Sequence, residues 1–227
     1  MPVLYSTLDT FTPDKLFAGN DVPVLVKGVT LKGGQGVLRR GSVLGLIILG
    51  AVTIAATAGN AGDAAIASAT LAANAQKGVY TIKCITAPSQ AAENDAKFAV
   101  FAPDGSRLAD AVQNVDYAGG HLVFKISNAT AADSAVGDSY TITVAAGSEG
   151  AVLVDNSKLD GTGIADCILV TETDTGDASP DDDIYAEVYT SGHFNRQALV
   201  FGGNDNASDH EARLRELNII LSDNIAY

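Results

Sequence analysis

Three histidines are the side chains of this sequence best suited to proton transfer near neutral pH: His121, His193 and His210. None lies in an H-E-x-x-H pattern, which would indicate a zinc-dependent hydrolase. His193, followed by Phe194 and Arg196, could act as a general acid or base, but the spacing supplies no carboxylate partner for it. We therefore expect His193 at a strand end or an interface, and His210 on an exposed first turn of a helix.

The sequence contains no recognisable nucleophile or phosphate-binding motif. It has no G-x-S-x-G elbow for a catalytic serine. The glycine-rich stretches 33–36 and 161–163 are not followed by G-K-[ST] and do not complete G-x-G-x-x-G, so they indicate turns. We expect no catalytic residue, no cofactor and no enzymatic activity; a hydrolase using His193 is the least favoured alternative.

An acidic stretch could bind a hard cation such as calcium, because clustered carboxylates suit that ion. Its members are Asp174, Asp177, Asp181, Asp182 and Asp183. The order D-x-[DN]-x-[DN]-G of a calcium loop is absent, so a solvated charged loop is the preferred interpretation and no metal site is predicted. Whether the loop binds a cation stays open at this point.

The charge balance excludes one class of partner. The 227 residues include 14 Lys and Arg against 27 Asp and Glu, a net charge of -13. Nucleic-acid binding is driven by basic side chains that neutralise phosphates, so no nucleic-acid partner is expected. The two cysteines, Cys84 and Cys167, lie in strand-like apolar runs and are expected to be buried free thiols, as in a protein made in a reducing cytoplasm.

One apolar segment, residues 42–62, could be mistaken for a membrane helix. Its apolar centre is shorter than the roughly 18 residues that a spanning helix needs, and Gly45 and Gly50 interrupt it. Short β-branched runs punctuated by glycine indicate buried strands. We therefore expect no membrane partner.

The elements that must position these residues are mostly strands. Alternating or continuous apolar runs predict strands over residues 22–32, with a bulge at Gly28, and over 37–47, 79–85, 97–102, 122–126, 139–144, 151–154, 165–171, 184–190, 193–201 and 218–221. Ser191-Gly192 is expected to form the turn between two of them. Residues 51–78, rich in Ala, Gly, Asn and Thr, form a compositional seam. A single short helix is expected, with Ser208 as N-cap and Glu211 completing a capping box.

Four motifs in order resemble the head decoration proteins of tailed phages, of the lambda type. They are VLRRGSVLG at 37–45, LDGTGIADCILV at 159–170, VYTSGHFNRQAL at 188–199 and LRELNIIL at 214–221. The residues that carry the likeness are Arg39, Arg40, Gly41, Asp160, Gly161, Gly192, Phe194 and Arg196. The resemblance covers roughly residues 1–50 and 150–227, and it leaves about a hundred residues as an insert similar to the Ig-like β modules of phage structural proteins.

The resemblance implies a mainly β fold and a division of the chain into parts. It implies a flexible N-terminal arm over 1–21, a discontinuous decoration-protein core over 22–50 and 150–227 with one short helix, and an inserted all-β, sandwich-like domain over 51–149. It further implies a homotrimer, made in the host cytoplasm, that binds the major capsid protein at three-fold sites outside the expanded shell and stabilises it against the pressure of the packaged DNA.

The arm is the expected capsid-binding segment, through β-augmentation of a capsid strand. The arm residues available for such contacts are Pro2, Val3, Leu4, Tyr5, Leu8 and Phe11. The alternative to a decoration protein is an adhesive β module, in which the insert contacts a host surface or glycan. The few aromatic residues of the insert, several at core-facing positions, weaken this alternative. They are Tyr80, Phe98, Phe101, Tyr117, Phe124 and Tyr140.

Overall fold

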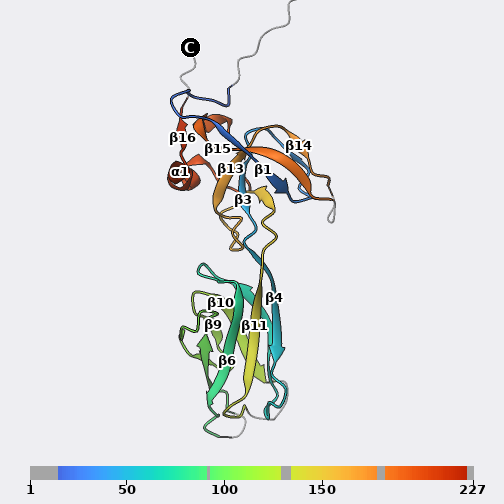
Figure 1. The fold of residues 1–227 in the computed structure, drawn as a ribbon. Coiled ribbons are helices and arrows are strands. Elements are labelled where there is room, and N and C mark those ends of the chain that lie inside the picture. Colours follow the sequence, from blue (N-terminus) through green and yellow to red (C-terminus); the bar gives the residue numbers. More distant parts are fainter. Residues whose placement is uncertain (1–14, 91–92, 129–133, 178–181, 224–227) are drawn as a thin grey trace, which may run out of the picture. The chain divides into compact units, whose positions relative to one another are not determined.

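The chain forms a mainly β structure with one α-helix among the residues described, which confirms the predicted fold class (Figure 1). The computed structural model describes residues 15–90, 93–128, 134–177 and 182–223. Two compact units are present: unit 1 comprises Met1–Leu44 with Ile164–Tyr227, and unit 2 comprises Gly45–Gly163. The sequence places the boundaries of the insert at residues 51 and 149, whereas the compact unit extends from 45 to 163.

Unit 1 is built on a sheet that closes on itself. A six-stranded sheet has the order β1-β12-β3-β13-β15-β16, and β1 also pairs with β15. A two-stranded sheet pairs β14 with β2. The elements of unit 1 are β1 (Leu25–Leu31), β2 (Val37–Leu38), β13 (Ala165–Leu169), β14 (Thr173–Asp174), β15 (Ile184–Asn195), a 3-10 turn (Arg196–Ala198), α1 (Ala207–Glu216) and β16 (Ile219–Ser222). Of the other two strands of the sheet, β3 (Val43–Leu46) spans the boundary at residue 44 and β12 (Ala151–Leu153) falls in the residue range of unit 2. The apolar run of β13 leaves its Cys167, Ile168 and Leu169 fully buried, as expected of a strand covered on both faces.

The longest strand, β15, corrects the predicted turn at Ser191-Gly192. It runs without interruption from Ile184 to Asn195 (Figure 1). The strand exchanges partners at this point, because β1 pairs antiparallel with it up to Ser191, and β16 pairs parallel with it from Gly192 onward. Gly192, at φ 148°, is therefore a residue inside a strand that changes neighbours, and the predicted hairpin over 184–201 is wrong.

The predicted bulge at Gly28 is also wrong. The pairing of β1 with β15 is continuous around Gly28, and its irregularity lies between Leu25 and Val26. A Cβ atom at Gly28 would overlap the ring of Tyr185. Gly28 interrupts the apolar alternation because only a residue without a side chain leaves space for this ring.

The N-cap of helix α1 lies two residues before the predicted one. Asn206 is the N-cap: its side chain accepts a hydrogen bond from the backbone of Ser208, and the Asp209 carboxylate accepts one from the backbone N–H of Asn206. The capping box is thus Asn206 with Asp209, and the predicted pair of Ser208 and Glu211 is wrong. Asn is as good an N-cap as Ser, and the local spacing fits both pairs.

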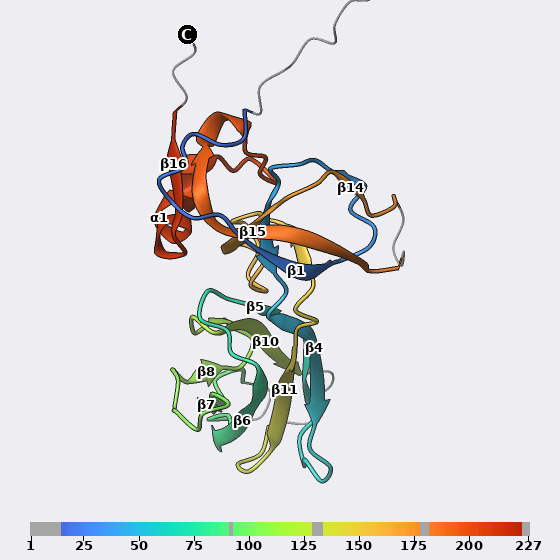
Figure 2. The same ribbon diagram turned by 45° about the horizontal axis from the view of Figure 1, so that its top comes forward.

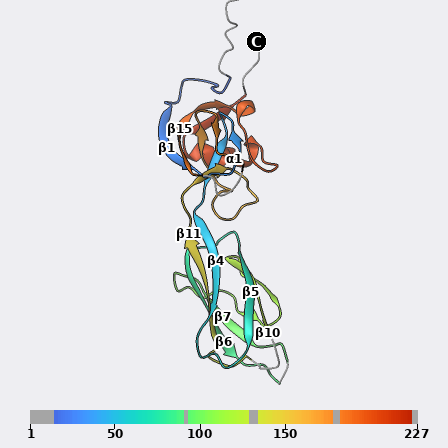
Figure 3. The same ribbon diagram turned by 90° about the vertical axis from the view of Figure 1, so that its right-hand side faces the viewer.

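Unit 2 consists of two antiparallel sheets around a shared apolar core (Figures 2 and 3). One sheet has the order β4-β11-β6-β7-β8 and the other β5-β10-β9. Their bounds are β4 (Leu49–Ala56), β5 (Ala64–Leu71), β6 (Gly78–Thr86), β7 (Lys97–Phe101), β8 (Ala111–Val112), β9 (Asp116–Ala118), β10 (Leu122–Asn128) and β11 (Ser139–Ala146). Side chains from both sheets meet in the core, including Ile66 and Phe124 from one and Tyr80 and Ile142 from the other. This is the predicted sandwich-like arrangement.

The compositional seam at residues 51–78 contains most of β4, which falls in the apolar segment 42–62 where strands are predicted, and all of β5, which the sequence does not predict. In β5 the buried Ala64 and Ile66 alternate with the exposed Ala65 and Ala67. Alanine is depleted in strands, so it gives a weak strand signal even where burial is periodic. The apolar segment 42–62 contributes β3 and β4, which confirms strands there. Within the part of the chain described, no helix is long and apolar enough to cross a membrane.

Candidate functional site

The Arg-Arg-Gly segment of the first motif is a tight turn locked into unit 1. Gly41 has φ +88°, and a Cβ atom there would lie 2.9 Å from the carbonyl oxygen of Ala198. The N–H of Gly41 donates to the carbonyl of Leu169 at 3.0 Å. Arg40 donates from Nε to a backbone carbonyl at 3.1 Å, and its guanidinium lies 5.9 Å from the ring centre of Phe17. Arg39 is exposed. The close approach explains the glycine by sterics alone.

The third motif supplies the aromatic centre of unit 1. Phe194 is fully buried, with its ring centre 5.1 Å from that of Phe17 and 5.4 Å from that of Tyr189. A Cβ atom at Gly192 would lie 2.8 Å from the Phe194 ring, so the glycine makes room for it. Arg196 forms an ion pair with Glu211 of α1 at 2.8 Å. These motif residues hold β15 against its neighbours.

Asp160 and Gly161 belong to unit 2, separately from the other motif residues. The Asp160 carboxylate accepts hydrogen bonds from the backbone N–H and the hydroxyl of Thr162, at 3.1 and 2.6 Å. Its carbonyl accepts the N–H groups of Ile48 and Leu49, both at 2.8 Å. Gly161 takes φ +106°, which favours glycine. The Asp-Gly pair is therefore a structural turn.

The predicted arm residues Pro2, Val3, Leu4, Tyr5, Leu8 and Phe11 lie outside the residues described, but the segment that follows them is anchored. Phe17 forms an antiparallel bridge with Phe194. The N–H of Ala18 donates to the carbonyl of His193 at 3.0 Å, and the N–H of Asn195 donates to that of Leu16 at 2.8 Å. Residues 16–18, predicted as part of a flexible arm, thus form a short extension of the sheet beside β15.

His193 has the carboxylate partner that sequence spacing could not supply. Its Nδ1 lies 2.5 Å from Oδ1 of Asp21, a residue 172 positions earlier in the chain. Its Nε2 lies 2.7 Å from the hydroxyl of Ser222 on β16. The tautomer with the proton on Nδ1 satisfies both contacts, since Nδ1 then donates to the carboxylate and Nε2 accepts the Ser222 proton. The hydrogen bond from His193 is the largest cause that lowers the pKa of Asp21.

An exposed apolar surface follows Asp21 in the chain. We call it the 22–26 surface because it is formed by residues 22–26. Leu25 is 59% and Val26 51% exposed, although both are large apolar residues. One hollow in this surface, of about 360 Å³, is lined by Asp21, Val22, Pro23, Leu25, Ser191 and Asn218. A second, of about 460 Å³, is lined by Phe17, Gly19, Asn20, Val22, Pro23 and Val24. Neighbouring exposed apolar residues make the 22–26 surface a candidate for contact with a partner.

His210 is buried, and the predicted exposed position is wrong. Its side chain is 4% exposed and its Nε2 lies 2.8 Å from Oδ2 of Asp205, which is equally buried. The ring of Phe201 stacks on His210, with centres 5.5 Å apart and planes 5° from parallel. Sequence reasoning missed this pair because Asp205 precedes the helix, where nothing in the pattern indicates burial.

The described part of the acidic loop is paired or solvated. Asp183 forms an ion pair with Lys32 at 3.0 Å, which is the main reason that its pKa is lowered. Asp174 accepts a hydrogen bond from the backbone of Gly176. Asp177 and Asp182 are exposed, and Asp181 lies outside the residues described. Among the residues described, no group of His, Cys, Asp or Glu is arranged to hold a metal ion.

Both cysteines are buried free thiols, as predicted. Cys167 lies in unit 1 and Cys84 in unit 2. Burial raises the pKa of the Cys167 thiol to about 12, and it also raises that of Cys84. Thiols with raised pKa values react slowly, so neither cysteine is a candidate nucleophile.

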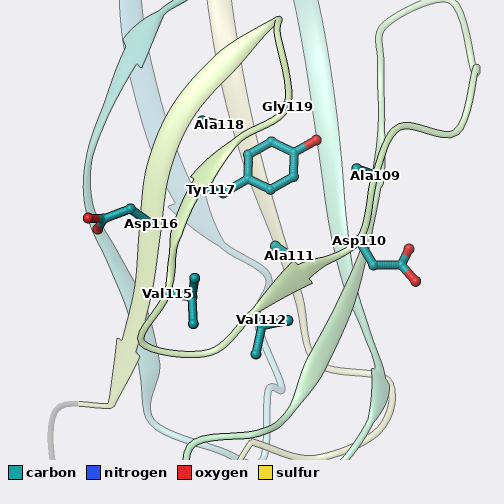
Figure 4. Close-up of a pocket in the computed structure, with 9 residues that line it drawn as sticks. All are labelled: Ala109, Asp110, Ala111, Val112, Val115, Asp116, Tyr117, Ala118 and Gly119. Carbon is teal, nitrogen blue, oxygen red and sulfur yellow. The ribbon is translucent and has the colours of Figure 1, made fainter.

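Unit 2 has a shallow pocket of about 210 Å³ beside β8 and β9 (Figure 4). Its lining is Ala109, Asp110, Ala111, Val112, Val115, Asp116, Tyr117, Ala118 and Gly119. Asp110 is paired with Arg107 at 2.8 Å, and Asp116 lies 3.8 Å from Lys125. The Tyr117 ring packs on Phe124, with centres 4.6 Å apart.

The aromatic residues of unit 2 are mostly core residues. Five of the six named above are at most 5% exposed, and the sixth, Phe101, is half-buried. A sugar-binding site usually exposes an aromatic face, and Tyr117 presents to its pocket a side chain that is almost completely covered. The argument against the adhesive alternative is that these aromatic side chains are buried in the core.

Comparisons with known proteins identify no family for this chain. No family model matches it, and neither does any curated protein sequence. Two crystal structures of FlgL from Xanthomonas campestris share a partial likeness, with TM-scores of 0.33 and 0.32 and sequence identities of 17% and 19%. The likeness covers 48% and 45% of this chain but only 33% and 31% of the FlgL chains. Likenesses this weak carry no functional argument.

Proposed function

We propose that this chain is a structural virion protein that binds the outer surface of an expanded phage capsid as a homotrimer at three-fold sites and stabilises the shell. The observation that carries the proposal is the joining of the four sequence-distant motifs by contacts within unit 1. The N–H of Gly41 in the first motif donates to the carbonyl of Leu169 in the second at 3.0 Å. Ile168 of the second motif pairs with Tyr189 of the third, and Gly192 of the third pairs with Ile219 of the fourth.

The proposed contact with the major capsid protein extends from the arm to the 22–26 surface. The arm leads directly into residues 16–18, which are bonded to β15, so any partner held by the arm is tied to the sheet of unit 1. The exposed Leu25 and Val26 continue this segment and offer apolar area to the same partner. The net charge of -13 keeps the unbound protein soluble.

The test is to mix the purified protein with expanded capsids that lack decoration and to measure binding. We expect saturable binding at a fixed ratio to the capsid lattice, and a mass of three chains for the free protein in sedimentation equilibrium. Deleting residues 2–12 should abolish binding and leave the folded units intact. Leu25→Asp should weaken binding, whereas Val123→Asp, at a 39% exposed position of unit 2, is the matched control that should not. Unchanged binding after the deletion would refute the role of the arm.

The second candidate is an adhesive module that binds a host glycan through unit 2. The observation in its favour is the pocket beside β8 and β9, whose lining includes two carboxylates, Asp110 and Asp116, on either side of Tyr117 (Figure 4). Carboxylates accept hydrogen bonds from sugar hydroxyls. Binding of the whole chain on a glycan array, lost in Asp110→Ala and Asp116→Ala but kept in Leu25→Asp, would favour this function over the first.

A further inference from the structure

Asp21, His193 and Ser222 are arranged as the acid, base and nucleophile of an acyl-transfer site. They come from the segment before β1, from β15 and from β16, so the fold alone brings them together. The two contacts of His193, 2.5 Å to the carboxylate and 2.7 Å to the hydroxyl, use different ring nitrogens. Such an arrangement is recognised by geometry and by the role of each group, whatever their order in the chain.

We propose that Ser222 is an activated nucleophile and that unit 1 hydrolyses small neutral esters. As the Ser222 oxygen attacks the ester carbonyl, Nε2 of His193 takes the hydroxyl proton, while Asp21 holds the Nδ1 proton and stabilises the imidazolium. The bond to the leaving alcohol breaks and the alcohol takes the proton from His193. Water then attacks the acyl-serine, giving its proton to His193, and Ser222 recovers that proton as the acid leaves. The net reaction is ester plus water to acid plus alcohol.

The surroundings restrict the substrate class. Asp21 lines a hollow of about 360 Å³ together with the apolar residues Val22, Pro23 and Leu25, and apolar surroundings favour a neutral ester over a charged one. A chain with net charge -13 and a carboxylate, Asp223, next to Ser222 disfavours anionic substrates. Ser222 pairs with Asn195 of β15, and the residue after Asn195 is the positively charged Arg196. The Nε atom of Arg196 lies 3.7 Å from the carboxylate of Asp223.

The exposure of His193 and Asp21 ranks the contributions of these two groups. The His193 side chain is only 15% exposed and is held on both sides. The Asp21 side chain is 67% exposed, so water competes for its carboxylate and screens its charge. We therefore expect removal of the hydroxyl to abolish reactivity, removal of the base to slow it by about 100-fold, and removal of the carboxylate to slow it by less, about 5-fold.

The test uses an alkyl fluorophosphonate, which a basic serine oxygen attacks at phosphorus with loss of fluoride. Intact-mass analysis of the full chain should show one adduct, and peptide mapping should place it on Ser222. Ser222→Ala should show none. His193→Gln should label about 100-fold more slowly, because it lacks the ring nitrogen that takes the Ser222 proton.

Two controls separate reactivity from stability and from the proposed function. His121→Gln changes a histidine of unit 2 whose ring contacts Tyr80, and it should leave the labelling rate unchanged. Protection of the buried Cys167 thiol verifies that each variant is folded. Labelling that persists in Ser222→Ala, or a rate equal in wild type and His193→Gln, would overturn the proposal. Ser222→Ala should still bind capsids, so failure here leaves the capsid proposal standing.

Discussion

Phe194→Ala should destabilise unit 1 selectively. The Phe194 side chain is fully buried and packs against Phe17 and Tyr189. Truncating a buried phenylalanine typically costs 3 to 5 kcal/mol, and the two ring pairs place this position toward the upper half of that range. We expect a loss of about 4 kcal/mol in the free energy of unfolding of unit 1. Unit 2 has a core of its own, so its stability should be unchanged.

The two buried cysteines allow the units to be followed separately. Cys167 is completely buried in unit 1 and Cys84 is 1% exposed in unit 2. Each thiol reacts with an alkylating reagent only when its unit opens, so the rate of modification reports the opening equilibrium. A loss of 4 kcal/mol corresponds to an increase of about 1000-fold in the modification rate of Cys167. Peptide mass spectrometry after timed labelling distinguishes the two sites.

A matched variant in the other unit completes the experiment. Phe124→Ala removes a side chain that is 3% exposed in the core of unit 2, and it should accelerate modification of Cys84 while leaving Cys167 protected. If Phe194→Ala exposed both thiols equally, the two units would unfold as one. If it accelerated Cys167 by less than about 10-fold, the packing argument for Phe194 would be wrong.

Four further variants test other contacts by the same labelling or by denaturant titration. Gly147→Ala forces a Cβ atom against a backbone carbonyl and should cost about 3 kcal/mol, whereas Gly59→Ala, with open space around a Cβ atom but φ +95°, should cost about 1 kcal/mol; equal costs would contradict the steric argument. His210→Ala leaves the buried Asp205 without its imidazole partner and should cost about 3 kcal/mol, which a loss below 1 kcal/mol would refute. Asp21→Asn tests how the pKa of Asp21 affects stability. Because this pKa is lower in the folded protein than its ordinary value of 3.8, the ionised carboxylate stabilises the fold above pH 3.8, and this stability is lost as the pH falls through the pKa of the folded state. The wild type should therefore lose more stability than the variant on acidification below pH 3.8, and parallel acid profiles would contradict this.

The sequence predicts the class of fold because most strands have a clear alternation. Residues 79–85 and 139–144 alternate inward and outward as β6 and β11 do. The strand β5 was not predicted within 51–78, because alanine carries little information on whether it lies in a strand. The turn at Ser191-Gly192 was predicted from composition, yet the glycine serves a change of strand partner, which depends on β16 nearly thirty residues later.

The candidate site could be predicted only in part. His193 is conspicuous in the sequence, but its partners Asp21 and Ser222 are distant residues of common types, and only the closed sheet brings them to the same ring. The burial of His210 depends likewise on Phe201 and on the loop before α1. Contacts between distant residues require the register of β15 with its neighbours, and no local pattern specifies that register.

The short pairing of residues 16–18 with β15 has a mechanical consequence. Phe17 bridges Phe194 in an antiparallel geometry, and hydrogen bonds flank the bridge on both sides. If the preceding residues are fixed to a large object, tension along the strand axis enters at Lys15 and loads these bonds together in shear. Rupture then requires several bonds to break at once, whereas a pull across the strands would open them singly. A segment paired to a strand in this way resists sustained load although only a few of its residues are paired.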